Sequence, residues 1–469
     1  MGRIISSYIF PHPPIIIPEV GRGEEKGAQA TTEAVKRAAQ DIAGEKPTTI
    51  IVTTPHGPVF QDYIYLSAEE RLSGDFGRFG AGHVRLEFDN NTELVRKIIE
   101  RAKAKGIFAG GLEDHLARQY RVSKELDHGA LVPLYFIRKQ YENFKLVHIS
   151  IAGLPFEELY KFGMGISEAV EDSDENVVFV GSGDLSHRLT KDAPAGFSKK
   201  GQVFDDMLVQ SVKTTDIEKL LLMDENLCDE AGECGLRSFI MMFGALDGLE
   251  LNSEVYSYEG PFGVGYSIAR IAVGEKQQER KVLQKVEEKM SERMKELREK
   301  EDEYVALARK TVEAYVKEGR IPKVPDGLPE EMLKEKAGTF VSIKKQGQLR
   351  GCIGTTGPTR KNIAEEIIYN AVSASTRDPR FDPVEPEELD KLVYSVDILK
   401  EPEPIQSKDE LDVVKYGVIV KSGARSGLLL PNLEGVNTPE EQVAITLQKA
   451  GIRRGEEYSM ERFEVIRHK

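Results

Sequence analysis

One segment, VVFVGSGDLSH at residues 177–187, joins a continuous apolar run to a glycine-rich loop that ends in His187. Runs of this kind, apolar on both faces, are typical of strands buried inside a parallel sheet. Similar apolar runs occupy residues 3–9, 48–53 and 146–151. Because the carboxyl ends of parallel strands meet at one edge of a sheet, we expect the loops after these runs to share a crevice.

Two further histidines stand in the same setting as His187. His12 follows the first apolar run in IFPHPP, and His56 follows the second in TTPHGP. The whole chain holds only eight histidines, so three in matching positions indicate a shared purpose. Neutral imidazole is the commonest metal ligand and the usual base near neutral pH. The sequence therefore favours a metal or acid–base site over three unrelated strand caps.

Residues 1–274 alternate strand-like runs with helical patterns, which predicts an α/β domain with a parallel or mixed sheet. We expect helices at residues 28–42, 91–105, 156–171 and 235–246. A glycine-rich turn precedes residues 266–273, which we interpret as an edge strand that closes the sheet.

The composition changes at residue 275. From there to residue 303 most residues are charged, while Val282, Val286 and Met290 recur at helical spacing. This pattern predicts a charged helical linker with one narrow apolar stripe. Residues 304–469 then mix short strands with helices, which predicts a smaller α+β domain. There we expect helices at residues 304–318 and 362–376, and strands at residues 339–344, 392–398 and 417–421.

The net charge limits which binding partners are expected, and the cysteine content indicates the cellular compartment. The formal net charge of −14 argues against nucleic acid as a partner. No apolar run approaches the roughly 20 residues of a membrane helix, so we expect no membrane interaction. Three cysteines, Cys228, Cys234 and Cys352, are an odd and sparse set that does not fit a disulfide framework. We therefore expect a cytoplasmic protein.

The segment DEAGECG at residues 229–235 contains candidates for a third metal ligand. Divalent iron and zinc centres commonly combine imidazoles with a carboxylate and keep positions open for substrate. The segment offers Glu230, Glu233 and Cys234 beside the expected ligands His12 and His56. It lies at the start of an expected helix, where free N–H groups favour a carboxylate or a thiolate. An ordinary helix cap is the competing interpretation.

The remaining histidines differ in their surroundings. His128 stands in DHGALVPL at residues 127–134, a loop setting that also fits a mechanism. We interpret His115 as part of a solvated polar loop, and we assign no role to His83, His148 and His468.

Four motifs in order carry a resemblance: PHP at residues 11–13, PHG at 55–57, DHGALVPL at 127–134 and GSGDLSH at 181–187. Together they resemble the class III extradiol ring-cleavage dioxygenases of the subunit-B type, over nearly all of residues 1–274. The resemblance implies a non-haem Fe(II) site that opens a catechol-like aromatic ring, with Zn(II) as the other metal to consider. It also implies that His12 and His56 are ligands, that His187 is the acid–base residue, and that His128 contacts substrate or dioxygen.

The pair Cys234-Gly235 is similar instead to the Memo-like relatives of that family, in which cysteine occupies the place of the carboxylate ligand. This departure keeps a second hypothesis open. The domain would then be a non-catalytic metal-binding scaffold or a protein-modification factor.

In the second half, QLRGCIGT at residues 348–355 places Cys352 between two glycines. Arg350 would face the same side of a continuing strand, where its charge would favour a thiolate. We therefore treat Cys352 as a candidate catalytic nucleophile, with a buried structural thiol as the alternative.

The motif LRGCIG at residues 349–354, with DPRF at 378–381, resembles the AMMECR-type domain over about residues 304–465. Fusion of the two halves resembles proteins A and B of the AmmeMemoRadiSam system. That resemblance implies a radical-SAM protein as a partner.

Overall fold

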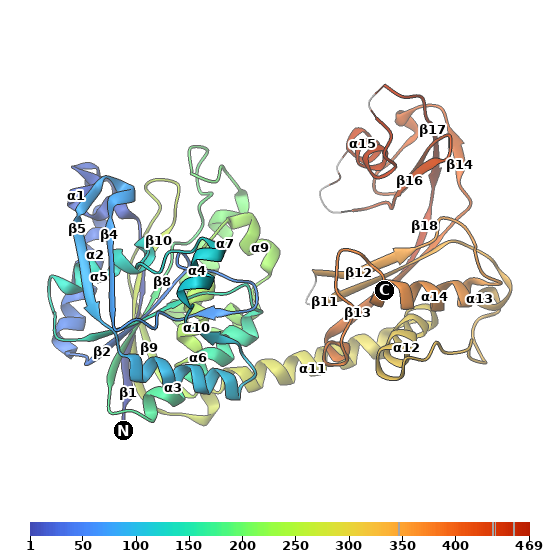
Figure 1. Ribbon diagram of the computed structural model, residues 1–469. Helices are drawn as coiled ribbons and strands as arrows, with labels where there is room; N and C mark the ends of the chain where they lie inside the picture. The colour runs from blue at the N-terminus through green and yellow to red at the C-terminus, as the bar shows by residue number, and fades with distance from the viewer. Residues whose placement is uncertain (346–347, 434–435, 437, 454) are drawn as a thin grey trace. The chain divides into compact units, whose positions relative to one another are not determined.

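The computed structural model describes residues 1–345, 348–433, 436, 438–453 and 455–469. The chain divides into two compact units, Met1–Lys289 and Met290–Lys469, which can be followed by colour in Figure 1. No helix in these described stretches is long and apolar enough to span a membrane. The expected domain limits of 1–274, 275–303 and 304–469 stay a prediction.

The first unit is built on a six-stranded mixed sheet, in agreement with the predicted α/β class. Its strands are β1 (Arg3–Phe10), β2 (Thr49–Thr54), β7 (Lys145–Ser150), β8 (Asn176–Ser182), β9 (Leu249–Glu259) and β10 (Tyr266–Lys276). The strand order is β7-β2-β8-β1-β10-β9. β7, β2, β8 and β1 are parallel, whereas β10 and β9 are antiparallel to their neighbours. The four parallel strands therefore end at one edge of the sheet.

The segment expected to be an edge strand lies inside the sheet instead. β10 pairs with β1 on one side and with β9 on the other, so β9 forms the edge. β9 lacks the continuous apolar run that marks the other strands, and most of its residues are half exposed. The prediction was wrong because no local pattern in the sequence announced this additional strand.

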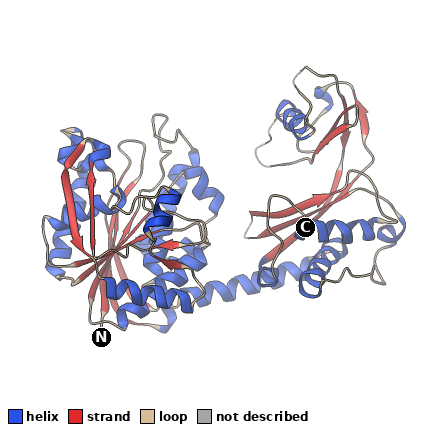
Figure 2. Ribbon diagram, in the orientation of Figure 1, coloured by secondary structure: helices blue, strands red, loops and turns tan. Residues whose placement is uncertain are grey.

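Helices cover both faces of the sheet, as Figure 2 shows. On one face, α2 (Gln29–Glu45) and α5 (His128–Arg138) pack against the sheet in a core that includes Tyr8, Val52 and Val180. On the other face, α6 (Phe156–Glu171) lies against α10 (Leu236–Gly244). A Cβ atom at Gly163 would lie 2.1 Å from the carbonyl oxygen of Met241. This close approach of two helices therefore requires glycine.

The remaining elements of the first unit lie around this framework. They include α1 (Pro18–Gly21), β3 (Ile64–Tyr65), β4 (Arg71–Phe76), the 3-10 turn η3 (Gly77–Phe79), β5 (Ala81–Asp89), α3 (Thr92–Ala104), β6 (Ala109–Gly110), α4 (Asp114–Tyr120), α7 (Lys199–Thr214), α8 (Ile217–Leu221) and α9 (Glu225–Ala231). β4 and β5 form an antiparallel hairpin that is visible at one flank in Figure 1. Leu72 and Phe76 of β4 enter the same core as α2 and α5, which anchors the hairpin.

The charged segment is a helix, α11 (Val282–Lys300), in agreement with its periodicity. Its apolar stripe is buried only at Leu283 and Val286 among the residues of this helix. The rest of the helix is largely solvated, as its charge predicts.

The second unit holds two antiparallel sheets. The first has the order β12-β11-β13-β18, and the second β14-β17-β15-β16. The strands are β11 (Thr339–Lys345), β12 (Gln348–Gly354), β13 (Leu392–Leu399), β14 (Glu403–Ile405), β15 (Gly417–Ser422), β16 (Arg425–Leu429), β17 (Ser459–Phe463) and β18 (Val465–His468). The helices are α12 (Glu303–Glu318), α13 (Glu330–Lys334), α14 (Ile363–Thr376) and α15 (Pro439–Lys449). α12 and α14 share a core with Val341, Ile343 and Val396 of the first sheet. This arrangement agrees with the expected α+β class.

Candidate metal centre

Four histidines of the first unit meet at the carboxyl edge of its parallel strands. His12 follows β1, His56 follows β2, His187 lies in the loop after β8, and His128 begins α5. The ends of these strands lie side by side because neighbouring strands pair in parallel. Residues that lie far apart in the sequence are thereby brought to one point.

His12, His56 and His128 form the tightest group. The Nε2 atoms of His12 and His56 lie 3.0 Å apart, and one ring nitrogen of each of the three histidines lies within 4.8 Å of the others. The rings of His56 and His128 stack with centroids 4.3 Å apart. His12 is buried and His56 is exposed, so the group runs from the interior to the surface.

The tautomer of His12 is fixed by Ser182 at the end of β8. The Ser182 hydroxyl donates its one proton to the carbonyl oxygen of Gly129 at 2.5 Å. It must therefore accept a hydrogen bond from Nδ1–H of His12, which lies 3.0 Å away. The proton on Nδ1 leaves a lone pair on Nε2 that faces His56. A ring held in this way is prepared to bind a cation.

His187 is held in a similar way by the connection between α9 and α10. Its Nδ1–H donates to the carbonyl oxygen of Gly232 at 2.5 Å. Its Nε2 therefore carries the lone pair and faces Cys234 Sγ and Asp184 Oδ2, each 4.0 Å away. An imidazole in this tautomer can accept a proton from a group in the centre.

Of the three candidates for a third ligand, the structure brings Cys234 to the histidines. Its Sγ lies 3.6 Å from His12 Nε2. The Glu233 carboxylate turns away and accepts the N–H of Leu236 at 2.7 Å, as a cap of α10. Glu230 is exposed at the end of α9, with its backbone carbonyl 3.5 Å from Arg188.

The carboxylate of Asp184 also lies beside His12, although the sequence argument did not single it out. One oxygen accepts the backbone N–H of His12 at 2.8 Å, and the other lies 3.8 Å from His12 Nε2. Asp184 stands inside the GSGDLSH loop, so its place after β8 was a usable signal. Tyr266 also lies nearby, and burial together with Asp184 and Cys234 raises the pKa of its phenol.

Burial keeps the imidazoles of His12, His56 and His128 uncharged at neutral pH, because it lowers the pKa of each of them. Burial and the neighbouring His128 lower the pKa of His56 to about 4. Burial and His12 lower the pKa of His128 to about 4, and burial and His56 hold the pKa of His12 well below its usual value. Burial raises the pKa of Asp184 to about 6, and burial with Asp184 raises the pKa of Cys234. Neutral imidazoles keep the lone pairs that a metal ion requires.

A buried contact between Asp127 and His148 supports the His128 side of the centre. Asp127 caps α5 by accepting the N–H of Gly129, and its second oxygen lies 3.1 Å from His148 Nε2. The Thr54 hydroxyl also donates to Asp127, at 2.6 Å. Burial opposes ionisation, but these donors hold the pKa of Asp127 below its usual range. His148 lies within a strand, so its support of Asp127 had no local signal in the sequence.

Comparison with known families agrees with this arrangement. Residues 6–269 match the family model described as the catalytic LigB subunit of aromatic ring-opening dioxygenase. The chain belongs to the LigB family. Residues 305–468 match the AMMECR1 family model, so a LigB-family domain is followed by an AMMECR1 domain. Both family resemblances seen in the sequence are confirmed.

Relatives of this LigB-family chain extend over different parts of it. Protein CA_C1420 of Clostridium acetobutylicum is 47% identical over 98% of both chains. A protein of Thermotoga maritima is 50% identical over 36% of this chain and 98% of its own.

Two solved structures are similar to parts of the chain. The uncharacterized protein PH0010 from Pyrococcus horikoshii covers 35% of this chain and 88% of its own, at 36% identity and a TM-score of 0.33. The uncharacterized protein JW3007 from Escherichia coli K12 covers 57% of this chain and 99% of its own, at 12% identity and a TM-score of 0.40.

Cys352 of the AMMECR1 domain lies on β12 opposite Ser342, whose hydroxyl donates to its Sγ at 3.2 Å. Arg350 does not share its side of the strand, because a register shift makes Arg350 the additional residue of a bulge. The Arg350 guanidinium pairs instead with Glu388, at 2.8 and 3.0 Å. Burial raises the pKa of Cys352, while Ser342 and Arg380 oppose that shift. The nucleophilic role of Cys352 stays a prediction without the support expected from Arg350.

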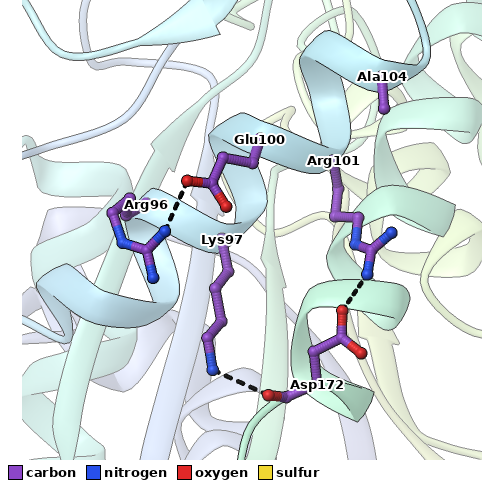
Figure 3. Close-up of a pocket in the computed structure, with 6 residues that line it drawn as sticks. All are labelled: Arg96, Lys97, Glu100, Arg101, Ala104 and Asp172. Carbon is purple, nitrogen blue, oxygen red and sulfur yellow. Dashed lines mark hydrogen bonds and ion pairs between the residues drawn. The ribbon is translucent and has the colours of Figure 1, made fainter.

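A pocket of the LigB-family domain lies over α3, as Figure 3 shows. Lys97 donates to the backbone oxygen of Asp172 at 2.8 Å, and Arg101 pairs with the Asp172 carboxylate. Arg96 pairs with Glu100. Asp172 lies shortly before β8 begins, so this pocket is at the amino edge of the sheet, opposite the histidines. Its cations are already paired within the protein.

Proposed function

We propose that the LigB-family domain binds one divalent metal ion through His12 and His56 and acts on a catechol-like aromatic with dioxygen. The convergence of the two Nε2 atoms at 3.0 Å carries this proposal. Two lone pairs that face each other at this distance repel unless a proton or a cation lies between them. Because His12 carries its proton on Nδ1, a proton between the two Nε2 atoms would have to be carried by His56. Otherwise a metal ion lies between them.

The donor set fits a metal of the iron or zinc class. Bonds of about 2.0–2.1 Å to nitrogen and about 2.3 Å to sulfur place neighbouring donor atoms roughly 3 to 3.6 Å apart. The His12–His56 separation of 3.0 Å and the Cys234–His12 separation of 3.6 Å both lie in this range. We propose Cys234 as the third ligand, with His128 as the alternative that the three-histidine group offers.

The metal would supply Lewis-acid chemistry toward the substrate hydroxyls and redox chemistry toward dioxygen. Fe(II) would supply both, whereas Zn(II) would supply only the first. His187 Nε2 is placed to take the proton of a substrate hydroxyl and to return it later, because its Nδ1–H is already committed to Gly232. His128, partly exposed beside His56, would contact the substrate or dioxygen.

Metal analysis tests the proposal. The full chain would be loaded anaerobically with Fe(II) or with Zn(II), freed of excess metal and analysed for bound metal. We expect one equivalent in the wild type and a loss in His12→Ala and His56→Ala. His115→Ala is the matched control, since His115 is an exposed histidine that pairs with Glu113. Full stoichiometry in both His12→Ala and His56→Ala would contradict the proposal.

The thiol of Cys234 favours a second candidate function. One cysteine with two imidazoles is a softer set of ligands than one carboxylate with two imidazoles, which is the set expected for ring cleavage. In this alternative the domain is a metal-binding scaffold or a protein-modification factor that works with a radical-SAM protein. Oxygen uptake by the iron-loaded protein with a panel of catechols separates the two candidates. Full iron occupancy without uptake would favour the scaffold.

A further inference from the structure

Asp205 of α7 is a buried carboxylate that the chemistry proposed above does not use. Its side chain is fully buried, and no lysine, arginine or histidine of the described chain forms an ion pair with it. Two neutral groups donate to it instead: the Ser186 N–H to Oδ1 at 2.8 Å and the Tyr258 hydroxyl to Oδ2 at 2.7 Å. Burial raises the pKa of Asp205 to about 7, while these two donors oppose the shift. Burying such a carboxylate costs stability, and two hydrogen bonds offset only part of that cost.

The N–H group that donates to Asp205 belongs to the loop that carries His187. Each backbone N–H of residues 183–188 in this loop donates to a partner. The six acceptors, in the order of their donors, are the carbonyl oxygen of Phe10, Cys234 Sγ, the carbonyl oxygen of Gly265, Asp205 Oδ1, the carbonyl oxygen of Ala231 and Ser186 Oγ. Asp205 is the charged acceptor among them, and charge-assisted hydrogen bonds are roughly twice as strong as neutral ones. It therefore contributes the strongest of the six contacts that fix this loop.

The carboxylate approaches the loop closely because Gly265 has no side chain. A Cβ atom at Gly265 would lie 2.1 Å from Asp205 Oδ2. The backbone of Gly265 also pairs with the loop: its N–H donates to the Ser186 carbonyl oxygen, and its own carbonyl oxygen accepts the Leu185 N–H, each at 2.8 Å. α7, β9 and the turn before β10 thus meet at the Ser186 peptide, directly before His187.

We propose that Asp205 is a positioning residue for His187 and acts through the Ser186 peptide. This inference rests on the proposed function, in which His187 takes the proton of a substrate hydroxyl. The His187 ring keeps its own proton on Nδ1 while it reaches the carbonyl oxygen of Gly232, 2.5 Å away. A shift of the Ser186 peptide displaces the ring from Gly232, and the proton is then free to move to Nε2. The lone pair that takes the substrate proton is thereby lost.

The tautomer of His187 tests the proposal without a metal ion or a substrate. Long-range ¹H–¹⁵N spectra of the full chain with labelled histidine would be recorded in a chelator at about pH 8.5, where imidazoles are uncharged. The variant His187→Gln identifies the His187 signals by their loss. We expect a single Nδ1–H tautomer in the wild type and a mixture of both tautomers in Asp205→Ala. Wild-type ring ¹⁵N shifts in Asp205→Ala would overturn the inference.

Three further variants separate positioning from a general loss of stability. Asp205→Asn keeps an oxygen that accepts the Ser186 N–H, and it should keep most of the wild-type tautomer. Asp206→Ala is the matched control, because it removes the adjacent exposed carboxylate, which accepts a hydrogen bond from Gln202. Leu208→Ala creates a cavity behind the same helix, and it should lower the unfolding temperature without changing the tautomer.

The His12 ring is an internal reference in the same spectra. Its tautomer is set by Ser182 at the end of β8, and it should be unchanged in Asp205→Ala. Equal changes in the rings of His12 and His187, or a mixture of His187 tautomers in Leu208→Ala, would assign the effect to a loosened domain. Either result would reject Asp205 as a positioning residue.

Failure of this inference is distinguishable from failure of the proposed function. With a catechol that the iron-loaded wild type consumes, Asp205→Ala should lower kcat by about 10-fold and leave KM and the metal stoichiometry unchanged. A wild type without oxygen uptake, in which the His187 tautomer still depends on Asp205, would reject the proposed reaction and leave the positioning role standing. An active wild type, with an Asp205→Ala variant that keeps both the tautomer and kcat, would reject the positioning role alone.

Discussion

Nδ1 of His12 and Oγ of Ser182 lie 3.0 Å apart, although 170 residues separate them in the chain. β1 and β8 pair in parallel, with Phe10 opposite Ser182, and this register brings the two side chains together. The orientation of a buried imidazole is therefore set by the pairing of two strands.

Ser182→Ala should weaken metal binding by about 10- to 100-fold, the range found when a partner behind a metal-binding histidine is removed. Without the hydroxyl, His12 is free to place its proton on Nε2, where it blocks the lone pair. Competition with a chelator would measure the affinity. The ¹⁵N shifts of the His12 ring in the metal-free protein would report the tautomer directly.

Ser150→Ala is the matched control for Ser182→Ala. Ser150 ends β7, is equally buried, and has an Oγ without a hydrogen-bond partner in the described part of the chain. Its removal should leave metal affinity unchanged. Equal affinities of the Ser182 variant and the wild type would show that the hydroxyl does not orient the ring.

Asp127→Ala should destabilise the LigB-family domain by about 3 kcal/mol or more. The change removes the cap of α5 and leaves Nε2 of the buried His148 without its partner, although Nδ1 keeps its contact with the Ser67 hydroxyl. Breaking a buried pair costs that much. Scanning calorimetry of the full chain would measure the loss. Asp224→Ala, which removes an exposed cap of α9, should cost only about 1 kcal/mol. Equal losses would contradict a structural role for the Asp127–His148 pair.

The AMMECR1 domain should lose stability in acid through Glu388. Burial raises the pKa of Glu388, but hydrogen bonds from Arg350 and Lys345 outweigh it and hold the pKa at about 2. Since this folded value lies below the ordinary 4.5, the contribution is complete above pH 4.5 and is lost as the pH falls toward 2. The full shift corresponds to about 3–4 kcal/mol, which solvent screening of this partly exposed carboxylate reduces to roughly 2–3 kcal/mol. Hydrogen exchange across β11 and β12 between pH 5 and about 2.5 would measure it.

Glu388→Gln should remove most of that pH dependence and lower the stability at neutral pH. Glu464→Gln is its control, because Glu464 forms exposed ion pairs with Lys400 and Lys415 that contribute little. A Glu388 variant with the acid sensitivity of the wild type would assign the effect to other carboxylates.

Cys352 should react with iodoacetamide more slowly in the folded chain than after denaturation. Burial raises the pKa of its thiol and lowers the thiolate fraction at a given pH. Peptide-resolved mass spectrometry across pH would follow it separately from Cys228 and Cys234. Arg380→Gln should slow the reaction further, whereas Arg350→Gln should not, because Arg350 is bound to Glu388. Faster reaction of the folded chain would restore the nucleophile hypothesis.

The sequence predicted where the buried parallel strands end, but it did not predict the β4–β5 hairpin or the edge strand β9. The apolar runs that end near His12, His56 and His187 are strands, and the helix expected at residues 156–171 has those bounds in the structure. Such elements carry their own periodicity and termination signals. The β4–β5 hairpin and the edge strand β9 do not, because their stability depends on partners elsewhere in the chain.

Side-chain direction was the harder part of the site. Glu233 and Cys234 are adjacent in a short connection between two helices, where neither helical nor strand periodicity applies. Only the close contact of this connection with the Asp184 loop turns Cys234 inward. Arg350 shows the same limit, since a single additional residue in β12 moves its side chain away from Cys352.

The central place of β1 in the sheet has a consequence for synthesis. β1 leaves the ribosome before β8 and β10, but it lies between these two strands, whose sequences end at Ser182 and Lys276. Until β8 has emerged, both edges of this apolar strand are unpaired, and such segments are prone to aggregate. His12 therefore reaches Ser182 only after β8 has emerged, and a nascent chain that stops before β10 leaves one edge of β1 unpaired.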